Sequence, residues 1–259
     1  MEKTTEIKFA RLLNEAISLP GVLAKHYSAF HRYSLCNQVA AILQCLVQGI
    51  AAGPIATYVG WKDKGRIVQK GSTAIALCMP IAHKISKKDK ETGETVDGVF
   101  QHFCWKKNWF VLSQTQGDDY AEVTKLPNWD VDKALTALEI VKVNFAYIDG
   151  NCQGYASGRD VAVSPLATFP FKTMLHELAH VVLGHTVELE MTDVDDTPRD
   201  IREVEAEAVA YLLSDLLNLN GKAESRGYIQ HWLRDGSIRE KSARRIFTAA
   251  DKILKAGSC

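Results

Sequence analysis

The sequence predicts an α+β protein with two domains, and three observations support this prediction. Both ends of the chain carry apolar residues at helical spacing, the middle carries runs rich in β-branched and aromatic residues, and a loop-like stretch separates the halves. The 259 residues are 46% hydrophobic, which is enough to bury a sizeable core. We expect residues 1–120 to combine helices with an antiparallel sheet, and residues 126–259 to be mainly helical with a small sheet.

The first half begins with three expected helices. The first helix stops at a Pro-Gly pair, as helices commonly do. The expected bounds are Lys3–Leu19, Val22–Phe30 and Leu35–Ile50. Beyond them, Thr73–Met79 and Val99–Trp105 read as strands on either side of the polar segment Ser86–Gly98. This pattern predicts an antiparallel sheet with a long polar hairpin loop.

The second half follows the loop-like stretch Gly117–Asn128, where we place the domain boundary. One short β section is expected within Tyr147–Val163. The remaining periodic segments predict helices over Val131–Phe145, Phe171–Gly184, Ile201–Leu217 and Ile238–Ala256.

A metal-binding pattern lies on the helix expected over Phe171–Gly184. A helix turns about 100° per residue, so His176 and His180 share one face and are within reach of a single ion. Zinc takes neutral imidazoles, and a catalytic zinc site combines three protein ligands with a water. Glu177 is placed to take a proton from that water as general base. The alternative is a surface helix with two chance histidines, but the flanking residues are apolar.

A third ligand has to come from another segment. Glu203 and Glu207 are one turn apart at the start of the helix expected over Ile201–Leu217. We assign Glu203 to the metal and Glu207 to the outer N–H of a ligand histidine, with Glu207 as the main competitor for the ligand position. The alternative is a solvated acidic face that suits the helix dipole. His185 is a weaker candidate, and a role at the helix end suits it better.

Charge and cysteine content narrow the class of protein. The net charge is zero, but residues 1–125 hold 16 Lys+Arg against 11 Asp+Glu, while residues 126–259 hold 15 against 20. This distribution suits a polyanion partner for the first half and a cation for the second. The six cysteines form no CxxC pair, and the sequence shows neither a signal-peptide core nor an apolar run of membrane-spanning length. We expect a soluble cytoplasmic protein without a membrane partner.

Two segments of the second half resemble a known family. HELAHVVLGH followed by EVEAEAVAYL is similar to the zincin domain shared by ImmA/IrrE-type metallopeptidases and ArdC antirestriction proteins. The Glu203-to-Glu207 arrangement also resembles the second metal helix of anthrax lethal factor, where the first Glu binds zinc and the second supports a histidine. The resemblance implies a Zn²⁺ cofactor and ranks Glu203 ahead of Glu207.

The first half resembles the single-stranded-DNA-binding domain of ArdC proteins. Tyr33, Ser34 and Asn37 match its YSxxN helix start, Trp61–Gly71 matches its W, GR, V, KG pattern, and Phe110–Thr115 matches its F-x-x-SQT strand. Single strands are bound by cations along the phosphates and by aromatic rings on the bases. The expected DNA contacts are Tyr33, Ser34, Asn37, Trp61, Lys62, Lys64, Arg66, Lys70, Trp105, Lys106, Lys107, Trp109 and Gln114. The alternative places the aromatic residues in the core and the lysines on a solvated face.

Together the patterns predict an antirestriction-type protein of a mobile element that binds single-stranded DNA and carries a zinc metallopeptidase-like domain, with a protein or peptide as its substrate. One alternative is a regulatory metalloprotease that cleaves a repressor and whose amino-terminal domain recognises protein. Another is a binding protein whose metal is structural.

Overall fold

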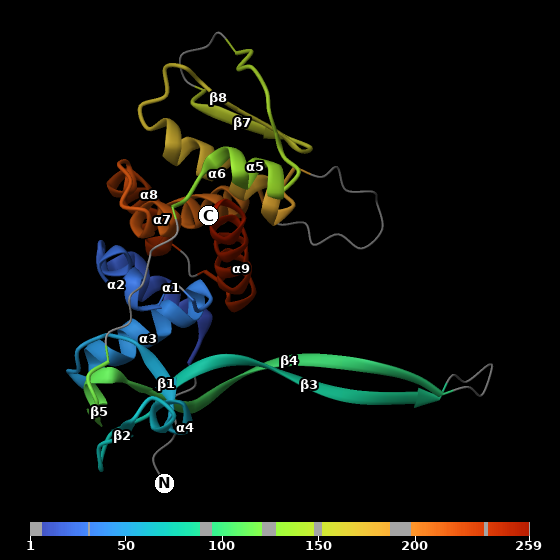
Figure 1. Cartoon of the computed structure of the whole chain (residues 1–259). Coiled ribbons are helices and arrows are strands. Elements are labelled where there is room, and N and C mark those ends of the chain that lie inside the picture. Colours follow the sequence, from blue (N-terminus) through green and yellow to red (C-terminus); the bar gives the residue numbers. More distant parts are fainter. Residues whose placement is uncertain are drawn as a thin grey trace. The chain divides into compact units, whose positions relative to one another are not determined.

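The computed structural model describes residues 7–30, 32–88, 95–120, 128–147, 152–186, 198–235 and 238–258 (Figure 1). Its contacts divide the chain into two compact units. The first unit, Met1–Ile42 and Val123–Cys259, contains the His176-Glu177-x-x-His180 motif and is called the HExxH unit below. The second unit, Leu43–Glu122, is called the hairpin unit. Contacts therefore group residues 1–42 with the second half, whereas the predicted division into 1–120 and 126–259 grouped them with the first. That division, which was placed at the loop-like stretch Gly117–Asn128, stays a prediction.

Helix α7 (Arg199–Leu216) is the central helix of the HExxH unit. All of its residues from Val204 to Leu216 are buried, so it is surrounded on every side. It packs against α6 (Pro170–Leu183), α8 (Lys222–Asp235) and α9 (Glu240–Gly257). Helix α5 (Val131–Ala137) packs against α9.

The amino-terminal helices belong to this unit because its carboxylates accept hydrogen bonds from their first backbone N–H groups. These helices are α1 (Phe9–Ser18), α2 (Val22–Phe30) and the first part of α3 (Leu35–Gln48). The first N–H groups of a helix have no partner within it, so a carboxylate there satisfies them and the helix dipole together. The bonds run from Phe9 and Ala10 to Glu240 at 2.9 and 3.0 Å, from Gly21 to Asp215 at 2.7 Å, and from Leu35 to Asp251 at 3.1 Å.

A small sheet completes the HExxH unit. Its strands are β6 (Val141–Lys142), β7 (Gly154–Ser157) and β8 (Asp160–Val163), in the order β6-β8-β7. β8 pairs with β6 in parallel and with β7 in antiparallel, so β7 lies at one edge of the sheet among the described strands. Helix α6 packs against both β7 and β8.

The hairpin unit is dominated by two long antiparallel strands, β3 (Ile75–Lys88) and β4 (Thr95–Val111). β1 (Ile55–Thr57) pairs with β4, and β2 (Arg66–Val68) pairs with β5 (Thr115–Gly117) in a separate sheet. The short helices α4 (Tyr58–Lys62) and η1 (Leu112–Gln114) complete the unit.

Three predicted segments are corrected. Ser86–Lys88 and Thr95–Gly98 are paired strand, not loop, because backbone pairing does not require apolar side chains; residues 89–94 lie outside the described part. The helix expected over Val131–Phe145 already ends at Ala137. Two residues later, Glu139 adopts a positive φ of 55°, which is incompatible with a continued helix. Helix α8 was not predicted, because its sequence is so polar that apolar residues at helical spacing do not stand out.

The prediction of an α+β fold with antiparallel pairing is confirmed. Helices α2 and α6 lie within one residue of their expected bounds, while residues 3–6 of the first expected helix lie outside the described part. No helix in the described ranges has both the length and the apolar character needed to cross a membrane.

Candidate metal centre and nucleic-acid interface

Helix α6 carries the His-Glu-x-x-His motif along one face. Pro170 occupies its first turn, where the missing N–H costs nothing, and Gly184 ends it in the left-handed region at φ 77°. Leu175, Leu178 and Ala179 are fully buried on the opposite side. Apolar burial therefore orients the helix so that its histidines turn towards α7.

Three ligand atoms converge at the contact between α6 and α7. His176 Nε2 lies 3.0 Å from His180 Nε2, and Glu203 Oε2 lies 3.4 and 3.6 Å from these two nitrogens. Ligands at about 2.0 to 2.1 Å around a tetrahedral ion are separated by about 3.3 Å, which is close to all three distances. The set of two imidazoles and one carboxylate therefore fits a divalent metal ion, and the structure brings together the three predicted ligands.

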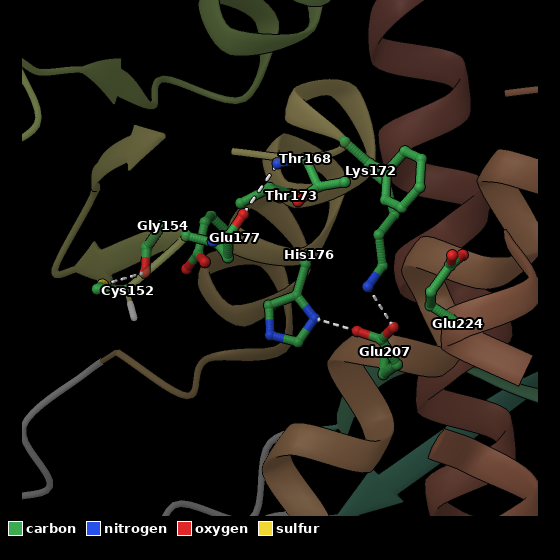
Figure 2. A pocket seen from close by; sticks show the side chains of 11 residues that line it. Cys152, Gly154, Thr168, Lys172, Thr173, His176, Glu177, Glu207 and Glu224 are labelled. Atoms are coloured by element: carbon green, nitrogen blue, oxygen red, sulfur yellow. Dashed lines mark hydrogen bonds and ion pairs between the residues drawn. The ribbon is translucent and has the colours of Figure 1, made fainter. Parts of the chain in front are cut away.

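Glu207 is the outer partner of His176. Its Oε2 lies 2.7 Å from His176 Nδ1, and its Oε1 lies 2.6 Å from Lys172 Nζ. Figure 2 shows Lys172 and His176 both pointing at this carboxylate. Although burial opposes ionisation, these two partners lower the pKa of Glu207 to about 2. Glu207 thus contacts the ring nitrogen of His176 that faces away from His180, and Lys172 is a second partner that was not predicted.

The proton affinities of His176 and Glu203 are coupled. Hydrogen bonds from the two histidines hold the pKa of Glu203 well below its usual range. Burial opposes protonation of His176, but Glu203 and Glu207 outweigh it and raise the pKa of His176 to about 9. In the metal-free chain His176 therefore carries a proton at neutral pH.

A different set of partners surrounds His180. Its Nδ1 lies 3.1 Å from His185 Nδ1, and His185 Nε2 lies 3.0 Å from Glu205 Oε2. Arg245 lies 3.4 Å from the same carboxylate oxygen. Burial disfavours the anion, but His185, Ser242 and Arg245 hold the pKa of Glu205 below its usual value. The sequence predicts a helix-end position for His185 and indicates no role for its ring or for Glu205.

Glu177 is buried beside the three ligand atoms. Burial raises the pKa of its carboxyl, and the charges of Glu203 and Glu207 add to this while the histidines oppose it. The neighbouring strand β7 comes so close that a Cβ on Gly154 would lie 2.8 Å from Glu177 Oε1 and 2.7 Å from Thr173 Cγ2. A glycine is therefore required at this position for the sheet to pack over the motif.

A pocket of about 610 Å³ opens next to this cluster (Figure 2). One wall comes from Cys152, Gln153 and Gly154 at the start of β7, and the opposite wall includes Lys172 and Glu224. Two of the motif residues, His176 and Glu177, line it as well. The pocket thus brings an edge strand and the candidate metal centre to the same space.

Four of the predicted DNA-contacting residues are buried. Asn37, Trp61, Trp109 and Gln114 are 7%, 0%, 9% and 5% exposed. The Trp61 indole N–H donates to the Phe110 carbonyl at 2.8 Å, and the Gln114 amide donates to the Thr73 carbonyl at 2.9 Å. These side chains stabilise the fold, which corrects the prediction that they contact DNA.

The other predicted contacts are open to solvent to different degrees. Lys62, Lys64, Lys70, Lys106 and Lys107 are exposed, whereas Tyr33, Ser34, Arg66 and Trp105 are partly exposed. The Arg66 guanidinium donates to Thr115 Oγ1 at 2.7 Å and to the Thr115 carbonyl at 3.2 Å, so it ties β2 to β5. Tyr33 and Ser34 belong to the HExxH unit, while the lysines belong to the hairpin unit.

Residues 14–116 match the model of a protein family described as the N-terminal domain of anti-restriction factor ArdC. The amino-terminal part of the chain is thus similar to this ArdC domain. The matched residues contain the three sequence patterns of the first half that suggested this family, from Tyr33 to Thr115. They also cross the boundary between the two units at residues 42 and 43, so the ArdC N-terminal domain is not identical with the hairpin unit.

Two solved structures of the antirestriction ArdC protein from plasmid R388 are similar to this chain. The metal-free structure has a TM-score of 0.54 at 22% identity and covers 96% of this chain and 94% of its own. The Mn(II)-bound structure has a TM-score of 0.53 at 21% identity and covers 96% and 95%. The shared fold thus extends over the candidate metal centre. No curated protein sequence matches the chain significantly.

Proposed function

We propose that this ArdC-like protein is an antirestriction-type protein with a zinc metallopeptidase-like centre and a single-stranded-DNA-binding amino-terminal domain. The observation that carries the proposal is the convergence of His176, His180 and Glu203 beside the buried Glu177. The name of the R388 protein supports an antirestriction role, and its Mn(II)-bound form supports a divalent metal. Zinc suits two imidazoles and one carboxylate best.

The chemistry that these residues support is hydrolysis of an amide. His176, His180 and Glu203 would hold a divalent ion, which would act as a Lewis acid that polarises a carbonyl oxygen and lowers the pKa of water. Glu177 accepts one proton from the attacking water, whose oxygen forms the new bond to the carbonyl carbon. The same carboxyl then gives the proton to the leaving amine as the C–N bond breaks. Burial raises the pKa of the Glu177 carboxyl, which favours its role as a proton acceptor.

The pocket favours an extended peptide as substrate. β7 pairs only with β8 among the described strands, so its outer edge offers backbone N–H and C=O groups beside Glu177. An extended chain adds to such an edge through main-chain hydrogen bonds. β7 passes close to Glu177 at Gly154, where a Cβ would lie 2.8 Å from Glu177 Oε1. A peptide added to this edge would therefore have its backbone near the general base.

A substitution of Glu177 tests the hydrolytic role. Glu177→Gln keeps the shape of the side chain but removes the base, so we expect metal content to stay at the wild-type level and peptide hydrolysis to fall by at least about 100-fold. The measurement is cleavage of unfolded protein substrates with metal analysis on the same samples. Full cleavage by this variant would exclude the mechanism.

DNA binding requires a separate experiment. Exposed lysines that contact phosphates release counterions, so the affinity for short single-stranded oligonucleotides should fall steeply as salt rises. An affinity that does not change with ionic strength would exclude this mode of binding. An absence of any binding would favour a regulatory metalloprotease whose amino-terminal domain recognises protein. Action in the cytoplasm stays a prediction.

A further inference from the structure

The two ligand histidines differ in how their outer nitrogens are held. His176 Nδ1 faces a carboxylate directly, at 2.7 Å from Glu207. His180 Nδ1 faces a second imidazole, at 3.1 Å from His185 Nδ1, and Glu205 lies behind that ring at 3.0 Å. The sequence of contacts from His180 through His185 to Glu205 is called the His–His–Glu chain below.

The positions of the protons in this chain follow from its geometry. A ligand histidine offers the lone pair of Nε2, so its remaining N–H is on Nδ1. That N–H can donate to His185 only if His185 Nδ1 is unprotonated, which places the His185 proton on Nε2. This second N–H then points at Glu205 Oε2, an acceptor. Each donor in the chain thus meets one acceptor.

The far end of the chain is fixed by buried charge. The Glu205 side chain is 1% exposed and lies 3.4 Å from Arg245. Arg245 also donates to the Leu183 carbonyl at 2.8 Å, in the last turn of α6. The carboxylate and the end of the motif helix are therefore held by the same side chain of α9.

We propose that His185 and Glu205 are positioning residues that hold His180 in the tautomer required of a metal ligand. The inference rests on the proposed metal centre and adds residues that act only through His180. A carboxylate or other acceptor behind a ligand imidazole fixes its tautomer and orientation and raises its basicity. In this protein a neutral imidazole is placed between the ligand and the carboxylate.

Two other roles for His185 are less consistent with the contacts. If it were a fourth ligand, one ring nitrogen would have to face the ion, but both ring nitrogens face other partners. If it only ended the helix, its backbone N–H, which donates to the His180 carbonyl at 2.9 Å, would suffice. Neither role requires the imidazole to lie between His180 and Glu205.

Nitrogen-15 NMR of the zinc-loaded wild-type protein tests the proposal without any substitution. The expected result is a proton on Nδ1 of His180 and a proton on Nε2 of His185. A proton on Nδ1 of His185, or protons on both of its nitrogens, would overturn the proposal. If the wild-type protein binds no zinc, the proposed function itself fails, and the two failures are thereby distinguished.

A pair of variants provides the second test. His185→Phe keeps a ring but removes both nitrogens, so zinc affinity measured by chelator competition should fall by about 10- to 100-fold. His185→Gln can still accept from His180 and donate to Glu205, so it should restore most of that affinity. Substitution of the exposed His231 of α8 by Phe is the matched control and should leave the affinity unchanged.

A purely structural role predicts a different result. In that case His185→Phe and His185→Gln would lower the thermal stability of the metal-free protein equally, and zinc affinity would not separate them. Equal zinc affinity in both variants would therefore contradict the proposal. If His185→Phe does not fold, the NMR measurement on the wild type decides.

Discussion

The HExxH unit and the hairpin unit use polar residues in opposite ways. In the HExxH unit the polar side chains around the motif are largely buried and paired with one another, as in Lys172–Glu207–His176. In the hairpin unit the predicted polar contacts divide into buried residues that hold the fold, such as Gln114, and lysines exposed to solvent. Paired, buried polar side chains are thus concentrated in the HExxH unit, while the hairpin unit presents separate exposed lysines.

The largest effect is expected from a variant that disrupts the metal centre and leaves the hairpin unit intact. His180→Ala removes one ligand, so zinc affinity should fall by more than the roughly 100-fold that loss of an outer partner costs. Oligonucleotide binding should stay at the wild-type level. Chelator competition and an oligonucleotide titration on the same preparation measure both, and a variant that keeps its zinc would contradict the assigned ligand set.

The next effect separates core packing from DNA contact in the hairpin unit. Trp61 is fully buried, so Trp61→Ala should lower the free energy of unfolding by about 3–5 kcal/mol. Trp61→Phe refills most of the space and loses mainly the bond to the Phe110 carbonyl, about 1 kcal/mol. Denaturant unfolding measures both. Lost DNA binding with unchanged stability in Trp61→Ala would show that the ring contacts DNA.

The metal centre should also respond to pH. In the metal-free chain burial disfavours the protonated ring, but Glu203 and Glu207 outweigh it and raise the pKa of His176 to about 9. An ion has to displace this proton, so affinity should rise about tenfold per pH unit below pH 9 and level off above it. Calorimetry in buffers of different ionisation enthalpy measures the released proton. An affinity independent of pH between 7 and 9 would contradict this coupling.

The smallest expected effect concerns the exposed lysines. For single strands, the slope of log affinity against log salt concentration becomes less negative by about 0.7 for each phosphate contact that is removed. The double variant Lys106→Ala, Lys107→Ala should therefore flatten the slope by about 1.4. Lys252→Ala, on α9 of the other unit, is the control and should keep the wild-type slope. An unchanged slope in the double variant would exclude both lysines from the phosphate path.

The grouping of the candidate metal ligands could be predicted from the sequence because helix geometry alone aligns residues four apart. His176 with His180, and Glu203 with Glu207, needed only the correct helices, and both helices were correctly predicted. Lys172, His185 and Glu205 were harder, because their roles depend on how α6, α7 and α9 pack. Gly154 was not foreseen, since only the close approach of β7 to Glu177 explains it.

In the hairpin unit, the sequence could not predict which aromatic residues are buried. An aromatic ring between lysines has the same pattern whether it lies in the core or on the surface, so burial of Trp61 and Trp109 could not be read from the sequence. The same holds for the polar ends of β3 and β4, where pairing continues without an apolar signal.

X-ray absorption spectroscopy of the zinc-loaded protein shows directly which atoms bind the ion. With His176, His180 and Glu203 as ligands, the spectrum should show two imidazole nitrogens and at least one oxygen at about 2.0 to 2.1 Å from the ion. The imidazole signal should halve in the His180→Ala variant if any zinc remains bound. A sulfur ligand at about 2.3 Å, or the absence of imidazole from the wild-type spectrum, would contradict the assigned centre.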